Sequence, residues 1–263
     1  MRDFHLPGRS SVFAINGMCA TSHPLAATAA LDVLKSGGNA VDAAIAGAIL
    51  LGICEPQMTG LGGDMFALIQ KDPSSNVVAL NGSGRAPQAA NAAALRASGL
   101  STIPLHCADA ITVPGAVDGF CRMAEDFGIL GLANILAPAI HYARAGVPVA
   151  PRVAFDWDLS AGLLQGSARE KFLIAGTAPK VGQVFTSPSQ AEALERIAIY
   201  GRDGFYAGAV AEDMVASLQA IGGRHSMEDF AATTATYGTP LQSSYKGIDM
   251  LEHPANGQGA TAL

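Results

Sequence analysis

Gly37-Gly38-Asn39-Ala40-Val41-Asp42-Ala43-Ala44-Ile45 is the stretch of sequence that decides the fold of this chain. The glycine pair ends one helix, Asn39 is a preferred N-cap residue for the next, and the helix dipole favours Asp42 in the first turn. The apolar run from Ala40 to Cys54 is hydrophobic on nearly every side, which is typical of a buried helix. It is about one turn too short to cross a bilayer. The stretch therefore predicts a core helix over Ala40–Ile53.

Helix-start and helix-stop signals define the neighbouring elements. Pro24–Lys35 is expected to be helical, because Pro24 suits the first helical position and Gly37 the position after the last turn. Ser226 and Asp229 have the spacing of a capping box at the start of a short helix. Further helices are expected at Pro114–Phe127, Leu132–Ala145, Pro188–Tyr200 and Ala209–Ile221, and strands at Met65–Gln70, Val77–Leu80, Leu241–Tyr245 and Ile248–Glu252. These strands pair in sequence order, so two hairpins are predicted.

Composition limits the class of protein. The 263 residues suffice for a sizeable core, and only 14% of them are charged, against roughly 25% in an average globular protein. The net charge of −6 argues against nucleic acid or an anionic membrane as a partner. No linker or boundary interrupts the pattern, so residues 1–263 are expected to form a single domain.

The sequence shows no motif of a disulfide framework, a metal site or a secretory signal. Four scattered cysteines without a CxxC pair predict free thiols in a reducing compartment rather than a disulfide framework. Six histidines show no metal-ligand spacing, so neither a metal nor a cofactor is expected. Met1–Ile15 lacks the apolar core of a secretory signal, which favours a cytoplasmic location.

Most motifs of known chemistry are absent from the sequence, including HExxH, GxSxG and the Walker A loop. Gly60-Leu61-Gly62-Gly63-Asp64-Met65-Phe66 resembles a dinucleotide loop only superficially. Met65 stands where the third glycine belongs, and the loop leads into a strand instead of a helix. A nucleotide-binding domain is therefore disfavoured, and a tight turn with close backbone packing is the favoured interpretation.

Asn81-Gly82-Ser83-Gly84-Arg85-Ala86-Pro87 follows the first expected hairpin. An arginine at a strand end among glycines can present its planar guanidinium to a carboxylate. A solvated loop arginine is the alternative, and the residues alone leave both open.

Several segments taken together resemble the γ-glutamyltranspeptidase family of self-cleaving N-terminal-nucleophile hydrolases. The resemblance runs from about Gly17 to the last residue. The segments that carry it are Met18–Pro24, Gly37–Ile45, Glu55-Pro56-Gln57 with Gly60–Phe66, Thr112–Val117, Pro138–Val147 and Gly204–Gly208.

This resemblance implies a helix-rich α+β fold that is part of a four-layer αββα sandwich. The chain would be the N-terminal large-subunit portion, incomplete without a C-terminal small-subunit portion. Such precursors cut themselves before a threonine, which becomes the nucleophile with its own α-amine as base, while backbone amides of a glycine pair stabilise the oxyanion. That threonine is expected beyond Leu263, so no catalytic residue is expected in this chain, and the chain alone is predicted to be inactive.

The end of the sequence supports the same expectation. Pro254–Gly259 resembles the proline- and glycine-rich loop that precedes the cleavage site, and Ala260–Leu263 looks like the first turn of a helix. The alternative is an inactive truncated relative that serves as a binding or assembly module. If the chain is instead part of an enzyme, its expected partner is the small-subunit portion. Further copies of that heterodimer are expected in a homo-oligomer.

The substrate expectation rests on two departures from the typical family pattern. Alignment on Ala86-Pro87 places Ser83 where typical members carry their carboxylate-holding arginine, and Arg85 lies two residues later. Asp64-Met65 replaces two further glycines. These differences favour the branch that includes oxamate amidohydrolase and cephalosporin-acylase-like proteins. Arg85 and Ser83 are therefore the candidate substrate-binding residues, and a small carboxylate-bearing amide is expected at least as much as glutathione.

Overall fold

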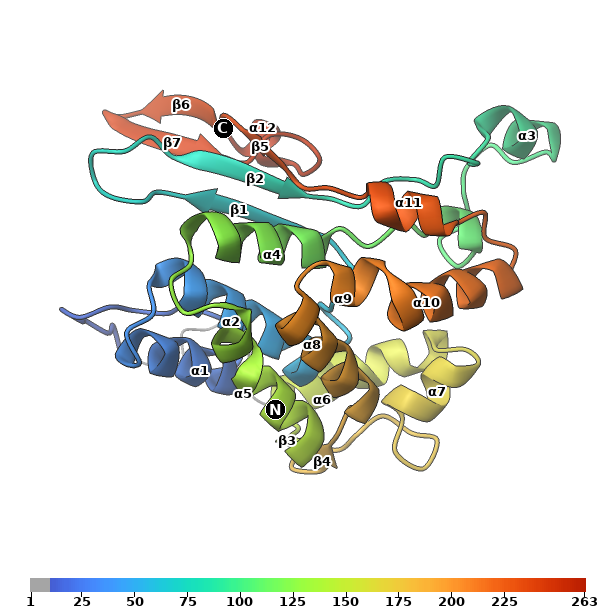
Figure 1. The fold of residues 1–263 in the computed structure, drawn as a ribbon, viewed down its shortest axis with the longest axis horizontal. Helices are drawn as coiled ribbons and strands as arrows, with labels where there is room; N and C mark the ends of the chain where they lie inside the picture. The colour runs from blue at the N-terminus through green and yellow to red at the C-terminus, as the bar shows by residue number, and fades with distance from the viewer. Residues whose placement is uncertain (1–9) are drawn as a thin grey trace. The chain divides into compact units, whose positions relative to one another are not determined.

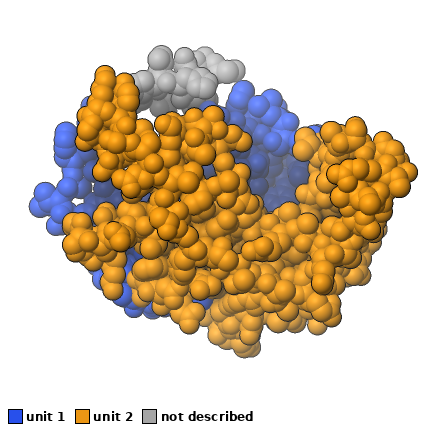
Figure 2. Space-filling view, turned by 90° about the horizontal axis from the view of Figure 1, so that it is seen from above, with its two compact units in different colours: residues 1–60, 129–195 blue, residues 61–128, 196–263 orange. Residues whose placement is uncertain are grey.

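The computed structural model describes residues 10–263, which form two compact units coloured separately in Figure 2. The first unit contains the chain up to Gly60 together with Ile129–Glu195, and the second contains Leu61–Gly128 together with Arg196–Leu263. Neither unit is a continuous stretch of sequence. The expected single domain stays a prediction.

The first unit is built on two neighbouring helices, α1 (Pro24–Lys35) and α2 (Ala40–Cys54), which run side by side in Figure 1. Both helices begin where the sequence predicted. The Nδ1 atom of His23 accepts a hydrogen bond from the backbone amide of Leu25 and so caps α1. Helix α5 (Leu132–Ala145) packs against α2 and completes the centre of this unit.

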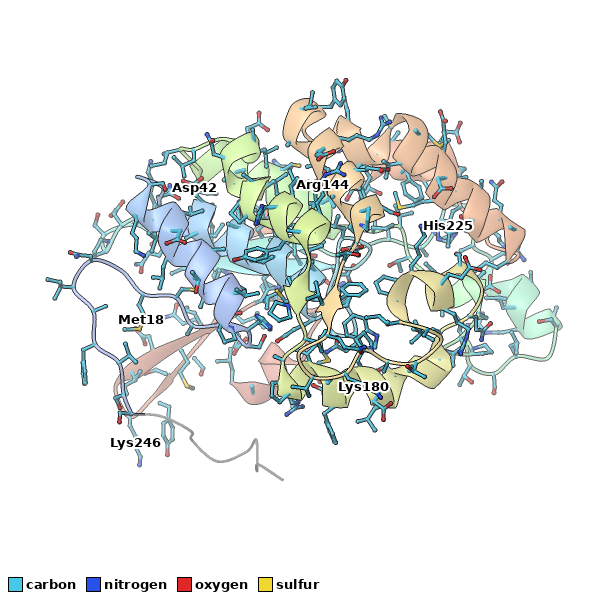
Figure 3. The ribbon with its side chains drawn as sticks, turned by 90° about the horizontal axis from the view of Figure 1, so that it is seen from below. Met18, Asp42, Arg144, Lys180, His225 and Lys246 are labelled. Carbon is cyan, nitrogen blue, oxygen red and sulfur yellow. The ribbon has the colours of Figure 1, made fainter. Side chains whose placement is uncertain are left out.

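Asp42, labelled in Figure 3, performs the capping role predicted for it and also makes a long-range contact. Its carboxylate accepts a hydrogen bond from the backbone amide of Asn39, which closes a capping box at the start of α2. The same carboxylate accepts the backbone amide of Ile129, 87 residues later, at 3.1 and 3.2 Å from its two oxygens. Since Asp42 is fully buried, these bonds satisfy a charge that water cannot reach.

The second unit contains a three-stranded antiparallel sheet in the order β1-β2-β5. Strands β1 (Met65–Ile69) and β2 (Val78–Gly82) form the predicted hairpin. Strand β5 (Thr236–Gly238) pairs with the other edge of β2 and was not predicted, because three residues carry too little pattern. Helix α4 (Ala116–Phe127) lies along one face of β1 and β2 in Figure 1.

Helix α4 starts two residues later than predicted. The backbone amides of Gly115 and Ala116 both donate to the carbonyl oxygen of Gly63, at 3.1 and 3.0 Å. These bonds anchor the start of the helix to the glycine-rich turn before β1. The turn at Gly60–Phe66 therefore acts through backbone hydrogen bonds, whereas a Cβ atom at Gly60 or Gly62 would meet nothing within 4 Å, so close packing at these two glycines stays a prediction.

The second predicted hairpin pairs β6 (Leu241–Tyr245) with β7 (Ile248–Glu252), with the bounds expected from the sequence. Its two turn residues, Lys246 and Gly247, have φ angles of 51° and 77°. Two positive φ values are the geometry that suits the twist of a two-residue hairpin turn.

The boundary between the units falls within α8 (Pro188–Tyr200). Further helices and strands complete the two units. They are α3 (Ala92–Ala97), α6 (Pro151–Ser160), α7 (Ser167–Phe172), α8 (Pro188–Tyr200), α9 (Asp203–Tyr206), α10 (Gly208–Ala220), α11 (Met227–Ala232), α12 (Gly259–Ala262), β3 (Val147–Pro148), β4 (Val184–Phe185) and the 3₁₀ turns η1 (Ala108–Ala110) and η2 (Ala161–Leu163). None of the helices formed by residues 10–263 has the length and apolar character needed to cross a membrane.

Candidate functional site

A small polar pocket opens where β2 ends, within the second unit. Its volume is about 140 Å³. Among the residues that the structure describes, the lining side chains are amides, hydroxyls and the guanidinium of Arg85, so they offer hydrogen-bond donors and a positive charge. The lining residues are Asn81, Ser83, Gly84, Arg85, Thr234, Thr236 and Asn256.

The bend after β2 is held by Asp64, in the turn that precedes β1. The carboxylate of Asp64 accepts a hydrogen bond from the backbone amide of Gly84 at 2.7 Å, and its second oxygen lies 3.5 Å from the hydroxyl of Ser83. On the opposite side, the amide of Val113 donates to the carbonyl oxygen of Arg85 at 2.9 Å. A Cβ atom at Gly84 would overlap the carbonyl oxygen of Val113, so only glycine fits between these neighbours.

Ser83 is part of a hydrogen-bond network at the pocket floor. Its backbone amide donates to Oδ1 of Asn81 at 2.9 Å, and its hydroxyl accepts a hydrogen bond from Nδ2 of Asn256 at 2.8 Å. Asn81 in turn donates from Nδ2 to Oδ1 of Asn256 at 2.9 Å. The two asparagines thereby connect β2 to the loop that follows β7, although 175 residues separate them.

Arg85 contributes the positive charge of the pocket. Its side chain is exposed, and its guanidinium has no hydrogen bond or ion pair with any residue of the described part of the chain. A planar guanidinium of this kind can bind a carboxylate through two parallel hydrogen bonds. The geometry therefore leaves Arg85 available to a small anion.

The opposite wall of the pocket comes from Thr234 and Thr236. Thr236 faces Asn81 in the register between β2 and β5, which fixes this wall against the end of β2. A further wall comes from the loop after β7. The Nε2 atom of His253 lies 3.0 Å from the carbonyl oxygen of Leu80, and its ring meets Phe66 edge-on at 5.0 Å between centroids.

The predicted substrate-binding residues, Ser83 and Arg85, lie in the same pocket but have different surroundings. The hydroxyl of Ser83 is engaged by Asn256, whereas the guanidinium of Arg85 has no partner among residues 10–263. None of the described residues that line the pocket is a histidine, cysteine or lysine, and Arg85 is the cationic side chain among them. Among residues 10–263, no group of three or more His, Cys, Asp or Glu side chains is arranged to hold a metal ion.

Sequence reasoning did not identify four residues that line the pocket. Asn256 lies in the proline- and glycine-rich loop, but nothing in that loop indicates which strand it meets. Thr234 and Thr236 follow α11 in a short polar run without a motif. Asn81 belongs to the quoted strand-end segment, but no motif in that segment marks it as a pocket residue. Their partners are distant in sequence, so the local pattern carried no signal for them.

Comparison with known proteins gives consistent results. The family model described as gamma-glutamyltranspeptidase matches residues 26–263. The glutathione hydrolase-like YwrD proenzyme of Bacillus subtilis (strain 168) is 37% identical over 256 residues, which cover 96% of this chain and 48% of that protein. The oxamate amidohydrolase proenzyme of Klebsiella pneumoniae subsp. pneumoniae is 35% identical over 240 residues, which cover 88% of this chain and 45% of that protein.

Solved structures show the same fold. The crystal structure of cephalosporin acylase from Bacillus halodurans superposes with a TM-score of 0.90 and 39% sequence identity. The match covers 99% of this chain and 50% of the acylase chain. The chain thus spans about half the length of the curated relatives that it matches.

Proposed function

Because the chain belongs to the gamma-glutamyltranspeptidase family, we propose that it forms the large-subunit portion of a self-processing amidohydrolase acting on small carboxylate-bearing amides. The family and its helix-rich α+β fold were expected from the sequence motifs, and both are confirmed. The finer statements about substrate, partner and processing are part of the proposal. The observation that carries it is the free guanidinium of Arg85 in a polar pocket.

The size of the pocket supports a small substrate. About 140 Å³ corresponds to roughly five water molecules at about 30 Å³ each. An anion of the size of oxamate fits within this volume, whereas a tripeptide would have to extend through the open side of the pocket. The polar walls also disfavour an apolar acyl group, because burying hydroxyls and amides against it would leave them without partners.

In the proposed reaction, Arg85 holds the substrate carboxylate while the scissile amide points away from the pocket. The nucleophile is the N-terminal threonine of a C-terminal portion, exposed when the precursor cuts itself. Its hydroxyl attacks the amide carbonyl and passes its proton to the threonine α-amine, which gives that proton to the departing amine as the C–N bond breaks. Water then hydrolyses the acyl-enzyme, releasing the acid and restoring the threonine hydroxyl. This chain supplies substrate binding, and its partner portion supplies the bond-breaking groups.

Self-processing is tested on the complete gene product, meaning the natural protein that contains these 263 residues. Intact-mass analysis is expected to find two fragments, the second beginning with threonine. Incubation with oxamate, γ-glutamyl amides and glutaryl amides then ranks the substrates, and oxamate is expected to be among those hydrolysed. One uncleaved chain without amide turnover would overturn the enzyme proposal and leave a binding or assembly role.

The role of Arg85 is tested by Arg85→Ala in the same protein. Loss of the guanidinium is expected to raise KM for oxamate at least tenfold with a smaller effect on kcat, because the carboxylate loses its charged partner. Arg96→Ala is the matched control, since Arg96 is an exposed arginine of α3 outside the pocket. Equal KM values for the two variants would contradict the assignment of the pocket.

A further inference from the structure

An ion pair between a buried aspartate and a partly exposed arginine lies in the second unit outside the pocket. Asp118 in α4 is 5% exposed, and its Oδ1 atom accepts a hydrogen bond from Nε of Arg202 at 2.6 Å. Arg202 directly precedes α9. Neither residue lines the pocket, and the proposed reaction uses neither of them.

Both members of this ion pair make further contacts, including one at 3.6 Å between Nη1 of Arg202 and the exposed carboxylate of Asp203. The Nη2 atom of Arg202 donates to the carbonyl oxygens of Ala231 and Thr233, at 2.8 and 2.6 Å. Its guanidinium lies over the ring of Tyr206, 4.7 Å from the centroid. The Tyr206 hydroxyl accepts the backbone amide of Asp118, so the ring that supports Arg202 is itself fixed to α4.

The second oxygen of Asp118 leads to the pocket wall. It accepts a hydrogen bond from the backbone amide of Ala235. The carbonyl oxygen of the same residue accepts a hydrogen bond from Nη1 of Arg122 at 3.0 Å. Ala235 is flanked by Thr234 and Thr236, the two threonines of the pocket, so α4 holds both polar backbone groups of the residue between them.

We propose that Asp118 and Arg202 are positioning residues that hold the Thr234–Thr236 wall in the geometry needed to bind the anion at Arg85. The inference rests on the proposed function, because it assigns the ion pair to the same site. Burying two charges contributes little to stability compared with apolar packing of similar volume. A fully satisfied polar network instead specifies one arrangement of the groups around it.

The segment between α11 and β5 has little regular structure of its own to hold it in place. It is irregular from Thr233 to Ala235, and β5 itself has three residues. The carbonyl contacts of Arg202 fix the start of this segment, and Asp118 fixes its end. Without these anchors the threonine hydroxyls have no rigid support on this side.

The test uses Arg202→Lys and Asp118→Asn in the complete gene product. Lysine keeps the charge but lacks the fork that reaches the carboxylate and the carbonyls together. Asparagine keeps the shape but loses the charge and one acceptor. Each variant is expected to raise KM for oxamate about tenfold with kcat within about twofold. KM for oxamide, the neutral analogue, should change less than twofold, because it does not need the anion site.

The matched control is Arg144→Lys. Arg144, labelled in Figure 3, forms a close pair with Glu195 through two hydrogen bonds of 2.8 and 2.7 Å. That pair is exposed and includes no residue of the pocket. Its loss should leave KM for both amides unchanged, so a general effect of breaking an arginine pair is distinguished from a local one.

A further variant is useful if disrupting the Asp118–Arg202 pair prevents folding. Arg122→Ala removes the hydrogen bond that the partly exposed Arg122 side chain donates to the carbonyl oxygen of Ala235. It leaves the Asp118–Arg202 pair intact. It is expected to raise KM for oxamate about threefold without affecting oxamide. Unchanged values for every folded variant of Asp118, Arg202 and Arg122 would overturn the inference.

Arg85→Ala in the same assay distinguishes a failure of the proposed pocket function from a failure of the positioning role of Asp118 and Arg202. If this variant binds oxamate as well as the unaltered protein does, the proposed function of the pocket fails, and the inference fails with it. If Arg85→Ala raises KM while the ion-pair variants do not, the inference alone fails. A parallel rise for oxamate and oxamide in Arg202→Lys would also overturn it, because it would indicate a general structural effect.

Discussion

The carboxylate of Asp64 accepts a hydrogen bond from the backbone amide of Gly84 at 2.7 Å. This bond joins the turn before β1 to the bend after β2, the two glycine-rich motifs of the sequence. Asp64 is also one of the two positions at which the chain departs from the typical glycine string of its family. The departure therefore has a structural role, because the aspartate fixes the bend from which Arg85 extends.

Removing this bond should loosen the bend. Asp64→Ala is expected to lower the free energy of unfolding by about 1 kcal/mol, the usual net worth of one hydrogen bond, and to raise KM for oxamate. Asp64→Asn keeps an acceptor for the Gly84 amide and should lie closer to the unaltered protein. Urea unfolding and steady-state kinetics measure both effects. Asp158→Ala, at an exposed aspartate of α6, is the control, and equal effects at the two positions would contradict this role.

Gly84 itself should tolerate no side chain. Gly84→Ala places a Cβ atom against the carbonyl oxygen of Val113 and the side chain of Thr112, so the strand end must move. We expect a loss of roughly 1–3 kcal/mol in unfolding free energy, as for other overpacked sites. Gly62→Ala, where a Cβ atom meets nothing within 4 Å, should be nearly neutral. A neutral Gly84→Ala would show that the bend is not constrained.

The buried carboxylate of Asp42 should be among the most sensitive positions of the first unit. Asp42→Ala removes the half of the capping box that Asp42 supplies and leaves the backbone amides of Asn39 and Ile129 without this acceptor. Loss of hydrogen bonds to a buried charged acceptor predicts a cost of roughly 2–4 kcal/mol in chemical unfolding. Asp32→Ala breaks only an exposed pair with Lys35 and should stay within about 0.5 kcal/mol. Similar costs for the two variants would contradict the role of burial.

Thiol reactivity should divide the four cysteines into two classes. Burial raises the pKa of Cys54 and of Cys121 to about 12, so neither forms a thiolate at pH 8. Cys19 and Cys107 are partly exposed. A thiol reagent such as DTNB is therefore expected to modify at most two cysteines in the folded protein and all four in denaturant. Rapid modification of Cys121 before unfolding would contradict its burial.

Alkaline pH should weaken the fold partly through Cys121. Burial raises the pKa of this thiol from 9.0 to about 12 on folding, so its contribution to stability is complete below pH 9 and is lost as pH rises toward 12. A single group of this kind changes the unfolding free energy by about 1.4 kcal/mol per pH unit within that window. Cys121→Ala should therefore show a shallower decline between pH 9 and 12 in pH-dependent urea unfolding. An unchanged slope would mean that other groups govern the decline.

Much of the fold was predictable because its signals are local. The cap at Asn39 and Asp42, the turn at Lys246 and Gly247 and the bounds of α8 all depend on residues within one or two turns of each other. Strand β5 was not predictable, because a three-residue strand is defined by its partner β2 and not by its own sequence. The hydrogen bond from the Ile129 amide to Asp42 was not predictable for the same reason, because it joins residues far apart in the sequence.

The sequence by itself determined the family, most of the helices and hairpins, and Arg85 and Ser83 as candidate residues. Only the tertiary structure decided which of their neighbours complete the pocket. Asn256 reaches Asn81 across 175 residues, and Asp118 reaches Ala235 across 117. Such contacts depend on how whole elements pack, since each residue type is compatible with many partners. Local chemistry therefore defined the strand end that carries Arg85, and long-range packing decided which residues surround Arg85 in the polar pocket.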